Sequence, residues 1–510
     1  MARWFLDRSP QRGIPSVSLR RLLPEAQFVG CHDWEVSGCT ADTRRLDPGQ
    51  VFVAVKGERL DGHSFVARAL EQGAAGVVVE RPCPEAGRLQ VVVSDGRVAF
   101  ARISHALAGA PAEKLRAFGV AGRRGKGATA LFLRAILEAH GESVGAIGRT
   151  GWSDGASTRP IGPDSPGSSG FASMMAAMVD RGCGSAVLEL DEGTLARREL
   201  DGVAFDSALV TNLGEGDGQG SDLDPRLRRR RAFARLARLV APGGSVVVDA
   251  DEPELDPLGS VNLEARRVTF GLDPERPAHV SAVVDRLDPS GTRFRLRGFD
   301  REVTVTLRLA GEEHVRHALA ASALAWSRGI PLDAVVNGLE SIGRLPGRLE
   351  PVLEGQGFEV RVDQARTAGE LSRALGALRG MVAGRLICVL GAQGGTGQRL
   401  ARVAIGRAVE ACADRVILTT DNPRLEDPDR ILDDLLAGFR RPGQALVEPD
   451  RRSAIAFALA DASPGDAVLI AGKGPHAYQI LADRIFPFDD ADVAAQWLRT
   501  HRPASRRTSA

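Results

Sequence analysis

The stretch Phe118-Gly-Val-Ala-Gly-Arg-Arg-Gly-Lys-Gly-Ala-Thr129 decides the fold, because an apolar run leads into it and a helical pattern follows it. Glycines let backbone N–H groups converge on phosphate oxygens, and the N-terminus of the following helix adds a favourable partial charge. Lys126 would then reach the terminal phosphates of a nucleotide. The stretch predicts a strand, a phosphate-binding loop and a helix. A glycine-rich turn without a ligand is an equally open alternative.

The loop lacks one group that phosphate-binding loops use. A Ser or Thr directly after the lysine normally ligates Mg²⁺. In this chain Gly127 and Ala128 follow the lysine, and the nearest hydroxyl belongs to Thr129. We therefore expect at most a weak or single Mg²⁺ site.

Short apolar runs alternate with helical segments on both sides of the loop. The expected strands of this region are 116–120, 144–147, 186–190 and 208–211, and the expected helices are 129–139 and 171–180. Such alternation favours a doubly wound, mostly parallel sheet. Residues 280–309 change to strand-like alternation, which predicts an antiparallel insert.

The same rhythm divides the whole chain. A small α/β unit precedes the linker near 111–114, and a third unit begins near Gly343 with expected strands at 386–390, 415–419 and 467–471. We predict an α/β protein with a central phosphate-loop domain and a Rossmann-like C-terminal domain. The predicted domains are 1–110, 111–340 and 341–501, followed by a disordered tail at 502–510.

Composition narrows the class of protein. The 510 residues are 43% hydrophobic and 26% charged, with a net charge of +1, so no global field favours nucleic acid or an anionic membrane. Six irregularly spaced cysteines favour free thiols in a reducing cytoplasm. No apolar run reaches the ~18 residues of a membrane span. Only four lysines stand against 62 arginines, so a retained lysine such as Lys126 or Lys473 is a candidate for a specific role.

Motifs along nearly the whole chain resemble those of the Mur ligase family, MurE branch. Gly122–Gly127 resembles its Gly-Thr-Asn-Gly-Lys-Thr loop. The other similar stretches are Asp42-Thr-Arg-Arg, Val51-Phe-Val-Ala-Val-Lys-Gly, Asp61-Gly-His-Ser-Phe, Phe205-Asp-Ser-Ala-Leu-Val-Thr-Asn-Leu, Pro346-Gly-Arg-Leu-Glu, Asp421-Asn-Pro-Arg-Leu-Glu-Asp-Pro, Ala471-Gly-Lys-Gly and Tyr478-Gln. This resemblance implies a three-domain ligase that uses ATP and Mg²⁺. It would join meso-diaminopimelate to UDP-N-acetylmuramoyl-L-alanyl-D-glutamate through an amide bond.

The resemblance also assigns roles to residues. It implies Lys126 and Glu189 as catalytic residues, with Glu189 as metal ligand. It implies an ATP site of Gly122, Gly125, Lys126, Gly127, Asn212, His314 and Arg348. It implies precursor binding by Thr43, Arg44 and Arg198, and amino-acid binding by Asp421, Asn422, Arg424, Gly472 and Lys473.

Departures from the family pattern concentrate on the chemistry. The loop's Thr-Asn is Arg123-Arg124, its metal-binding Thr is Gly127, and the second-metal histidine is missing from Gly214-Glu-Gly-Asp-Gly-Gln-Gly. The carbamylated lysine is expected to align with one of Arg228–Arg231, and a guanidinium cannot form the carbamate. Losing several such groups predicts weak or no catalysis.

Three functions stay open. The favoured one is a non-catalytic MurE-like protein that binds nucleotide or precursor and regulates or scaffolds a genuine Mur ligase or another wall enzyme. The second is an active ligase with a rebuilt metal site, for which Asp191, Glu192, Glu215 and Asp217 are candidates. The third is a nucleic-acid binder through the arginine run at 227–239, for which a solvated helix face is the better interpretation.

Overall fold

The computed structural model describes residues 16–501, except 58–59, 88, 150, 160, 162–164, 215–223, 289–290, 310 and 396–397. The expected tail at 502–510, and the candidates Glu215 and Asp217, lie outside these residues. The chain forms two compact units, Met1–Ser341 and Ile342–Ala510, and each is described by itself. The division into three domains at 110 and 340 stays a prediction.

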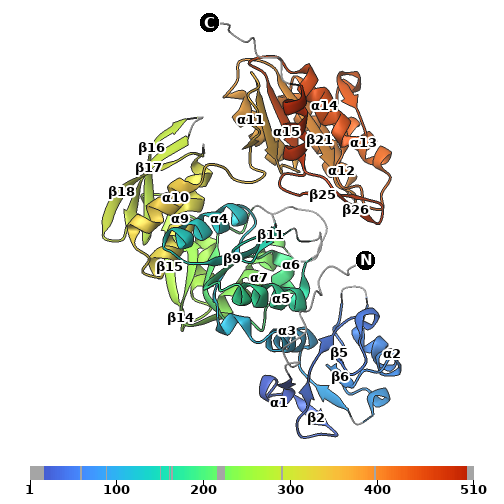
Figure 1. Ribbon diagram of the computed structural model, residues 1–510. Helices are drawn as coiled ribbons and strands as arrows, with labels where there is room; N and C mark the ends of the chain where they lie inside the picture. The colour runs from blue at the N-terminus through green and yellow to red at the C-terminus, as the bar shows by residue number, and fades with distance from the viewer. Residues whose placement is uncertain are drawn as a thin grey trace. The chain divides into compact units, whose positions relative to one another are not determined.

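The N-terminal part of the first unit contains a five-stranded sheet in the order β2-β7-β6-β5-β4 (Figure 1). Its strands are parallel except β2, which pairs antiparallel to β7. Valines of the inner strands fill the core with the apolar face of α3. The elements are α1 (Leu19–Leu22), β2 (Gln27–Val29), β4 (Cys39–Thr40), β5 (Val51–Val53), α2 (Val66–Glu71), β6 (Gly76–Val79), β7 (Gln90–Val92) and α3 (Gly96–Leu107), with β1 (Val17–Ser18) and β3 (Glu35–Val36) paired separately.

The central sheet has eleven strands in the order β11-β10-β9-β12-β8-β13-β14-β15-β16-β17-β18. Strands β9 to β16 of this order are parallel, and β16, β17 and β18 form the antiparallel insert predicted at 280–309. The strands are β8 (Arg116–Ala121), β9 (Val144–Gly148), β10 (Gly151–Ser153), β11 (Thr158–Arg159), β12 (Ser185–Glu189), β13 (Phe205–Val210), β14 (Val240–Asp249), β15 (Arg266–Gly271), β16 (Val280–Asp288), β17 (Gly291–Gly298) and β18 (Arg301–Leu307).

Helices cover both faces of this sheet. Apolar residues of α5, α6, α7 and α8 pack in one core with the strands, while α4, α9 and α10 pack together (Figure 1). The helices are α4 (Lys126–Ala139), α5 (Gly167–Asp180), α6 (Glu192–Ala196), α7 (Pro225–Arg238), α8 (Asp256–Gly259), α9 (Glu312–Ser327) and α10 (Leu332–Ser341). The predicted mostly parallel, doubly wound sheet is confirmed.

The second unit has a six-stranded sheet in the order β19-β20-β24-β21-β22-β23, parallel except β19. Its two faces form separate cores, one with α11, α12 and α13 and one with α14 and α15. The elements are β19 (Glu350–Pro351), β20 (Glu359–Asp363), α11 (Ala368–Arg379), β21 (Leu386–Ala392), α12 (Arg399–Cys412), β22 (Arg415–Thr420), α13 (Pro428–Leu436), β23 (Ala445–Val447), α14 (Arg451–Asp461), β24 (Ala467–Ala471), β25 (Tyr478–Leu481), β26 (Arg484–Pro487) and α15 (Asp490–Thr500). The predicted Rossmann-like arrangement is confirmed.

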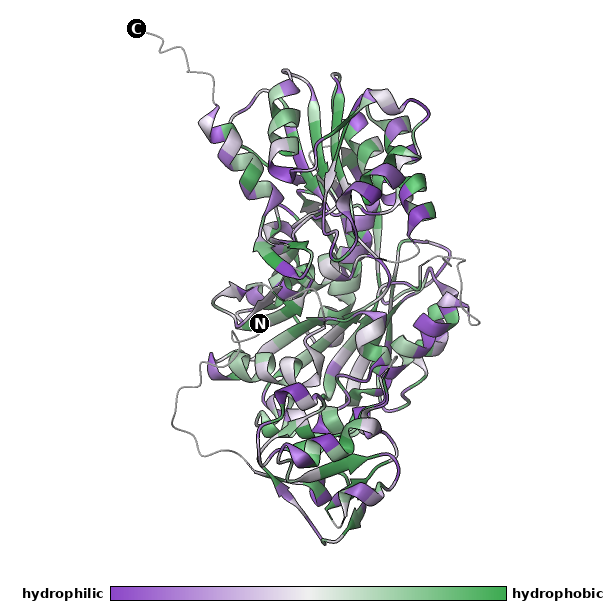
Figure 2. Cartoon of the chain, turned by 90° about the vertical axis from the view of Figure 1, so that its right-hand side faces the viewer, coloured by the Kyte–Doolittle hydropathy of each residue, from purple (hydrophilic) through white to green (hydrophobic). Residues whose placement is uncertain are grey.

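Hydropathy follows this layering. Figure 2 shows hydrophobic residues along the sheet strands and hydrophilic residues along the outer sides of many helices. Strands that are buried on both faces, such as β21 and β24, consist almost wholly of apolar residues. Among the described residues, no helix is both long and apolar enough to cross a membrane.

Candidate active site

The predicted phosphate loop lies at the junction of β8 and α4, at the carboxyl end of a central parallel strand. Gly122 and Gly125 have φ values of +139° and +79°, which residues other than glycine rarely adopt. A Cβ at Gly122 would lie 2.1 Å from Thr211 Oγ1, and a Cβ at Gly125 would lie 2.1 Å from His317 Nε2. Both glycines are therefore required by backbone conformation and by close packing, and the predicted strand–loop–helix junction is confirmed.

The residues that follow β13 hold the loop in shape. The Arg124 N–H donates to Asn212 Oδ1 at 3.0 Å, and Asn212 Nδ2 donates back to the Arg124 carbonyl at 2.9 Å. The Thr211 hydroxyl donates to the same carbonyl at 2.7 Å. The resemblance assigns Asn212 to ATP binding. In this structure its side-chain amide hydrogen-bonds the loop backbone, so Asn212 acts as a positioning residue.

Lys126 and Glu189 come together at the loop. Lys126 is the first residue of α4, and Glu189 ends β12, the strand beside β8. Burial lowers the pKa of Lys126, and the Glu189 carboxylate opposes that shift. Within the described residues the Lys126 ammonium has no hydrogen-bond partner. The site therefore presents an ammonium group beside backbone N–H groups, which suits the phosphates of a nucleotide.

Gly127 faces the candidate metal ligand directly. A Cβ at Gly127 would lie 3.3 Å from Glu189 Oε2, so a Ser or Thr hydroxyl at this position would stand beside the carboxylate. The next hydroxyl, that of Thr129, is fully buried, and its Oγ1 has no hydrogen-bond partner within the described residues. Thr129 therefore does not present its hydroxyl at the protein surface.

A divalent cation fits these residues poorly. Asp191 Oδ1 accepts the Thr194 N–H at 2.7 Å as the N-cap of α6, and Glu192 lies 3.9 Å from Arg228. Within the described residues, no group of three His, Cys, Asp or Glu side chains could hold a metal ion. Glu189 alone therefore provides the donor that the resemblance assigns to a metal, without the hydroxyl that normally shares it.

His314 and His317 lie on α9, with ring centroids 6.0 Å apart. His314 lies 3.9 Å from Glu313, while His317 packs against the loop glycine Gly125. Sequence reasoning assigned His314 to the ATP site and gave both histidines, three residues apart on a predicted helix, a nucleotide-edge or structural role. The spacing of the two histidines put them on one helix, but it carried no information about which strand end that helix covers.

The residues assigned to precursor binding have local ion-pair partners. Thr43 is buried in a short 3₁₀ turn, and Arg44 is exposed and forms a two-pronged pair with Asp42 at 2.9 and 2.8 Å. Arg198, with a φ of +59°, lies 3.3 Å from Asp95 and 3.9 Å from Asp201. Asp95 caps α3, so Arg198 links the central sheet's helical layer to the N-terminal part of the unit. Their role in binding a precursor stays a prediction.

In the second unit, Asp421 and Lys473 form a fully buried pair, with Lys473 Nζ 3.8 Å from Asp421 Oδ1. Lys473 also donates to the Tyr478 carbonyl, and burial lowers the pKa of Lys473 to about 8. Asn422 Oδ1 accepts the Ile480 N–H at 2.8 Å. These three side chains are buried and contact one another or the backbone near β25. Their direct contact with an amino-acid substrate stays a prediction.

Beside this cluster, Arg424 is exposed, whereas Gly472 is buried. Arg424 is exposed and has a φ of +57°, an uncommon conformation for a residue other than glycine. The Gly472 carbonyl accepts a hydrogen bond from Arg366 Nε at 2.7 Å. Arg348 donates to the Gln364 side-chain oxygen at 2.9 and 2.6 Å, in the amide orientation that satisfies both groups. Arg424 thus remains the exposed cation of its motif.

The arginine run of α7 corrects one expectation. Arg229 is 3% exposed, and it donates to the carbonyls of Leu213 and, at 3.2 Å, Pro225. The interpretation of the run as a solvated face is wrong for this residue, because its guanidinium anchors the segment after β13. Sequence reasoning missed it although Arg229 shares the helical spacing of the buried Phe233 and Leu236.

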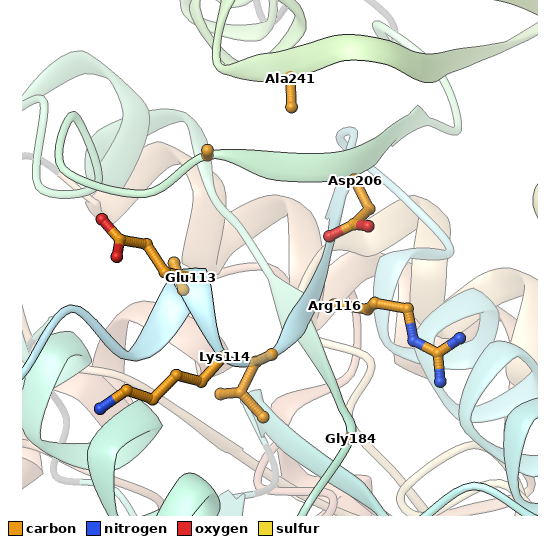
Figure 3. A pocket seen from close by; sticks show the side chains of 9 residues that line it. Glu113, Lys114, Arg116, Gly184, Asp206 and Ala241 are labelled. Atoms are coloured by element: carbon orange, nitrogen blue, oxygen red, sulfur yellow. The ribbon is translucent and has the colours of Figure 1, made fainter.

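A cavity of about 410 Å³ lies at the opposite ends of the strands, near Leu115, Asp206 and Ala241. Figure 3 shows Lys114 and Arg116 pointing in different directions from its rim. Asp206 accepts the Ala117 N–H at 2.9 Å, and Arg116 pairs with Glu142 at 3.1 Å. The cavity is distinct from the phosphate loop because it lies at the other ends of the strands. Its charged side chains do not point toward a common centre, so it offers no organised binding site.

Together, these features define the class: a phosphate-loop α/β protein with an additional Rossmann-like unit. Three family descriptions match the chain, namely "Mur ligase family, catalytic domain" at 35–107, "Mur ligase middle domain" at 120–325 and "Mur ligase, glutamate ligase domain" at 347–474. The chain belongs to the Mur ligase family, and its curated relatives support the MurE branch.

Two relatives show the extent of this likeness. The UDP-N-acetylmuramoyl-L-alanyl-D-glutamate–2,6-diaminopimelate ligase of Solibacter usitatus is 33% identical, over 95% of this chain and 97% of its own. The UDP-N-acetylmuramyl-tripeptide synthetase of Roseiflexus sp. is 34% identical, over 91% and 94%.

Solved structures share the fold. A UDP-N-acetylmuramoyl-L-alanyl-D-glutamate–2,6-diaminopimelate ligase has a TM-score of 0.66 at 24% identity, covering 95% of this chain and 99% of its own. MurF ligase from Thermotoga maritima in complex with ADP has a TM-score of 0.56 at 19% identity, covering 91% and 97%.

Proposed function

We propose that this chain is a MurE-branch protein of peptidoglycan-precursor metabolism in the cytoplasm, and that it binds ATP at the loop Gly122–Gly127. The relatives' names support a precursor of the UDP-N-acetylmuramoyl-dipeptide type as its second ligand. Ligation of meso-diaminopimelate is weak or absent. The observation that carries this proposal is that a Cβ at Gly127 would lie 3.3 Å from Glu189 Oε2, while this residue carries no hydroxyl.

Binding of ATP phosphates is supported by the shape of the loop. Two glycines with positive φ are enclosed by Thr211 and His317, and hydrogen bonds from Thr211 and Asn212 hold the loop backbone in place. A preformed site binds with less loss of conformational entropy than one that must order on binding. Lys126 adds an ammonium group that donates no hydrogen bond within the described residues.

Weak catalysis follows from charge. Phosphoryl transfer between a carboxylate and a nucleotide needs positive charge fixed at the oxygens where negative charge develops. Losing one such group costs about a hundredfold in rate or more. Lys126 remains, but the hydroxyl is missing at Gly127 and Asp191 is engaged as a helix cap. We therefore expect the protein to hold nucleotide and precursor, and to serve as a regulator or scaffold of a genuine Mur ligase or another wall enzyme.

An active ligase is the competing function, and the retained Asp421–Arg424 motif and the names of the relatives favour it. Phosphate release separates the two. The purified chain is mixed with ATP, Mg²⁺, UDP-N-acetylmuramoyl-L-alanyl-D-glutamate and meso-diaminopimelate, with Lys126→Ala as control. We expect release at the background of the control. Turnover of about one per second or faster, a usual enzyme rate, contradicts the proposal.

Nucleotide binding is tested separately by titration calorimetry with ATP. We expect the wild-type chain to bind ATP and Lys126→Ala to bind it at least tenfold more weakly, since a hydrogen bond to a charged group is worth about 1.5–3 kcal/mol. Equal affinities for both chains contradict the assignment of the loop.

A further inference from the structure

Arg149 lies next to the phosphate loop, and none of the roles given above uses it. Arg149 follows β9 and begins the tight turn into β10, where Gly148 pairs with Gly151. The Arg149 N–H donates to Glu189 Oε2 at 3.0 Å. A Cβ at Gly148 would lie 2.9 Å from the same oxygen, so the glycine allows this close approach. The turn is thereby fixed on the carboxylate that Gly127 faces.

The charge of the Arg149 guanidinium acts on Lys126. The largest effect on the pKa of Lys126 is burial, which lowers it, and the next is the Glu189 carboxylate, which raises it. The charge of Arg149 comes third and lowers the pKa of Lys126. The side chain is exposed, and within the described part of the chain it has no hydrogen-bond or ion-pair partner. Arg123 acts on Lys126 in the same sense. The Glu189 and Asp191 carboxylates oppose these cations, but Lys126, Arg123 and Arg149 outnumber them, so the loop keeps a net positive charge that attracts an anion.

A guanidinium suits this position better than a divalent cation does. Glu189 Oε2 already accepts a backbone N–H, and Gly127 supplies no hydroxyl, so a metal ion has few protein donors there. A guanidinium needs no ligands from the protein. It stays charged at all relevant pH values and donates two parallel hydrogen bonds to a phosphate.

Resting on the proposed binding of ATP, we propose that the loop holds the terminal phosphates of a nucleotide without a divalent cation. The guanidinium of Arg149, whose backbone N–H is held by Glu189, takes the place of that cation. The ligand would thus be the free nucleotide polyanion, and Mg²⁺ would add little to its affinity.

The test compares ATP binding by the full chain in excess EDTA and in excess Mg²⁺. For the wild type we expect dissociation constants within about threefold of each other in the two media. For Arg149→Ala we expect a loss of about tenfold in EDTA, the size of one charge-assisted interaction. Arg149→Lys keeps the charge without the planar fork, so we expect an intermediate loss.

A matched control removes an arginine elsewhere. Arg134 on α4 pairs with Glu138 at 2.7 Å on the helix surface, and Arg134→Ala should leave ATP affinity unchanged in both media. Arg149→Ala retains the backbone hydrogen bond to Glu189, and an unchanged melting temperature will verify that it folds.

The outcomes separate this inference from the proposed function. Binding by the wild type that requires Mg²⁺, or equal affinities of wild type and Arg149→Ala in EDTA, overturns the inference and leaves ATP binding intact. Failure of the wild type to bind ATP in either medium overturns both.

Discussion

The buried pair of Lys473 and Asp421 should respond strongly to the loss of its cation. Both side chains are 0% exposed, and the Asp421 carboxylate oxygens accept no hydrogen bond within the described residues. Lys473→Met leaves that buried carboxylate without its ion-pair partner, which typically costs about 3–5 kcal/mol. For a unit of this size, 1 kcal/mol corresponds to roughly 2–4 °C, so we expect the melting temperature of the unit Ile342–Ala510 to fall by roughly 6–20 °C.

Differential scanning calorimetry of the full chain measures this fall, with the exposed Lys114→Met as control. The double variant Lys473→Met with Asp421→Leu removes both charges and should recover most of the loss. A fall below about 1 kcal/mol for the single variant, or a double variant no more stable than the single one, refutes the reasoning.

The same pair predicts a pH dependence. Burial lowers the pKa of Lys473 from 10.5 to about 8, so the unfolded chain binds the proton more tightly than the folded chain between these values. The free energy of unfolding should therefore rise with pH from about 8 to 10.5 through this group, by roughly 3 kcal/mol in total. Lys473→Met should lack that rise, and an identical pH profile for both chains would show that the lysine is not desolvated.

Two further predictions concern the loop. Gly125→Ala forces a Cβ to within 2.1 Å of His317 Nε2 and should weaken ATP binding at least tenfold. The control Gly141→Ala, at a φ of +87° with nothing within 4 Å, carries the backbone strain alone and should leave ATP affinity unchanged. Equal losses of affinity in the two variants would assign the effect to strain. Gly127→Thr places a hydroxyl beside Glu189 and should make ATP binding stimulated by Mg²⁺, about tenfold in calorimetry; an unchanged response to Mg²⁺ would show that the missing hydroxyl is not what limits metal binding.

The sequence predicted those parts of the site that local pattern controls. Glycines around Lys126 carry the turn themselves, and an apolar run before them predicted β8 because a buried parallel strand reads as a continuous apolar run. Glu189 was found through the family resemblance, and the neighbouring positions of β12 and β8 bring it to the loop. Resemblance to a family supplied that pairing, since one chain's periodicity cannot fix the order of strands in a sheet.

What sequence reasoning missed depends on tertiary packing. Arg149 lies between β9 and β10, in the sequence Gly-Arg-Thr-Gly, which shows no hydrophobic periodicity. Only the tertiary fold brings its backbone N–H to Glu189. Lys473 was marked by the scarcity of lysine, but its pairing with Asp421 depends on the fold. Lys473 follows β24, and Asp421 follows β22, which is separated from β24 by β21 in the sheet. Arg229 was misjudged because charge was given more weight than helical position.

The retention of Glu189 has a physical explanation that does not require a metal. Its carboxylate supports the charge of a desolvated Lys126 and accepts the N–H that fixes the turn at Arg149. Replacing it would leave an ammonium group in a half-buried site without a compensating charge, which is costly whether or not catalysis occurs. A carboxylate at this position is therefore poor evidence for ligase activity. The group that discriminates is the hydroxyl after the lysine, because it has no other structural task in the loop, and this chain has glycine there.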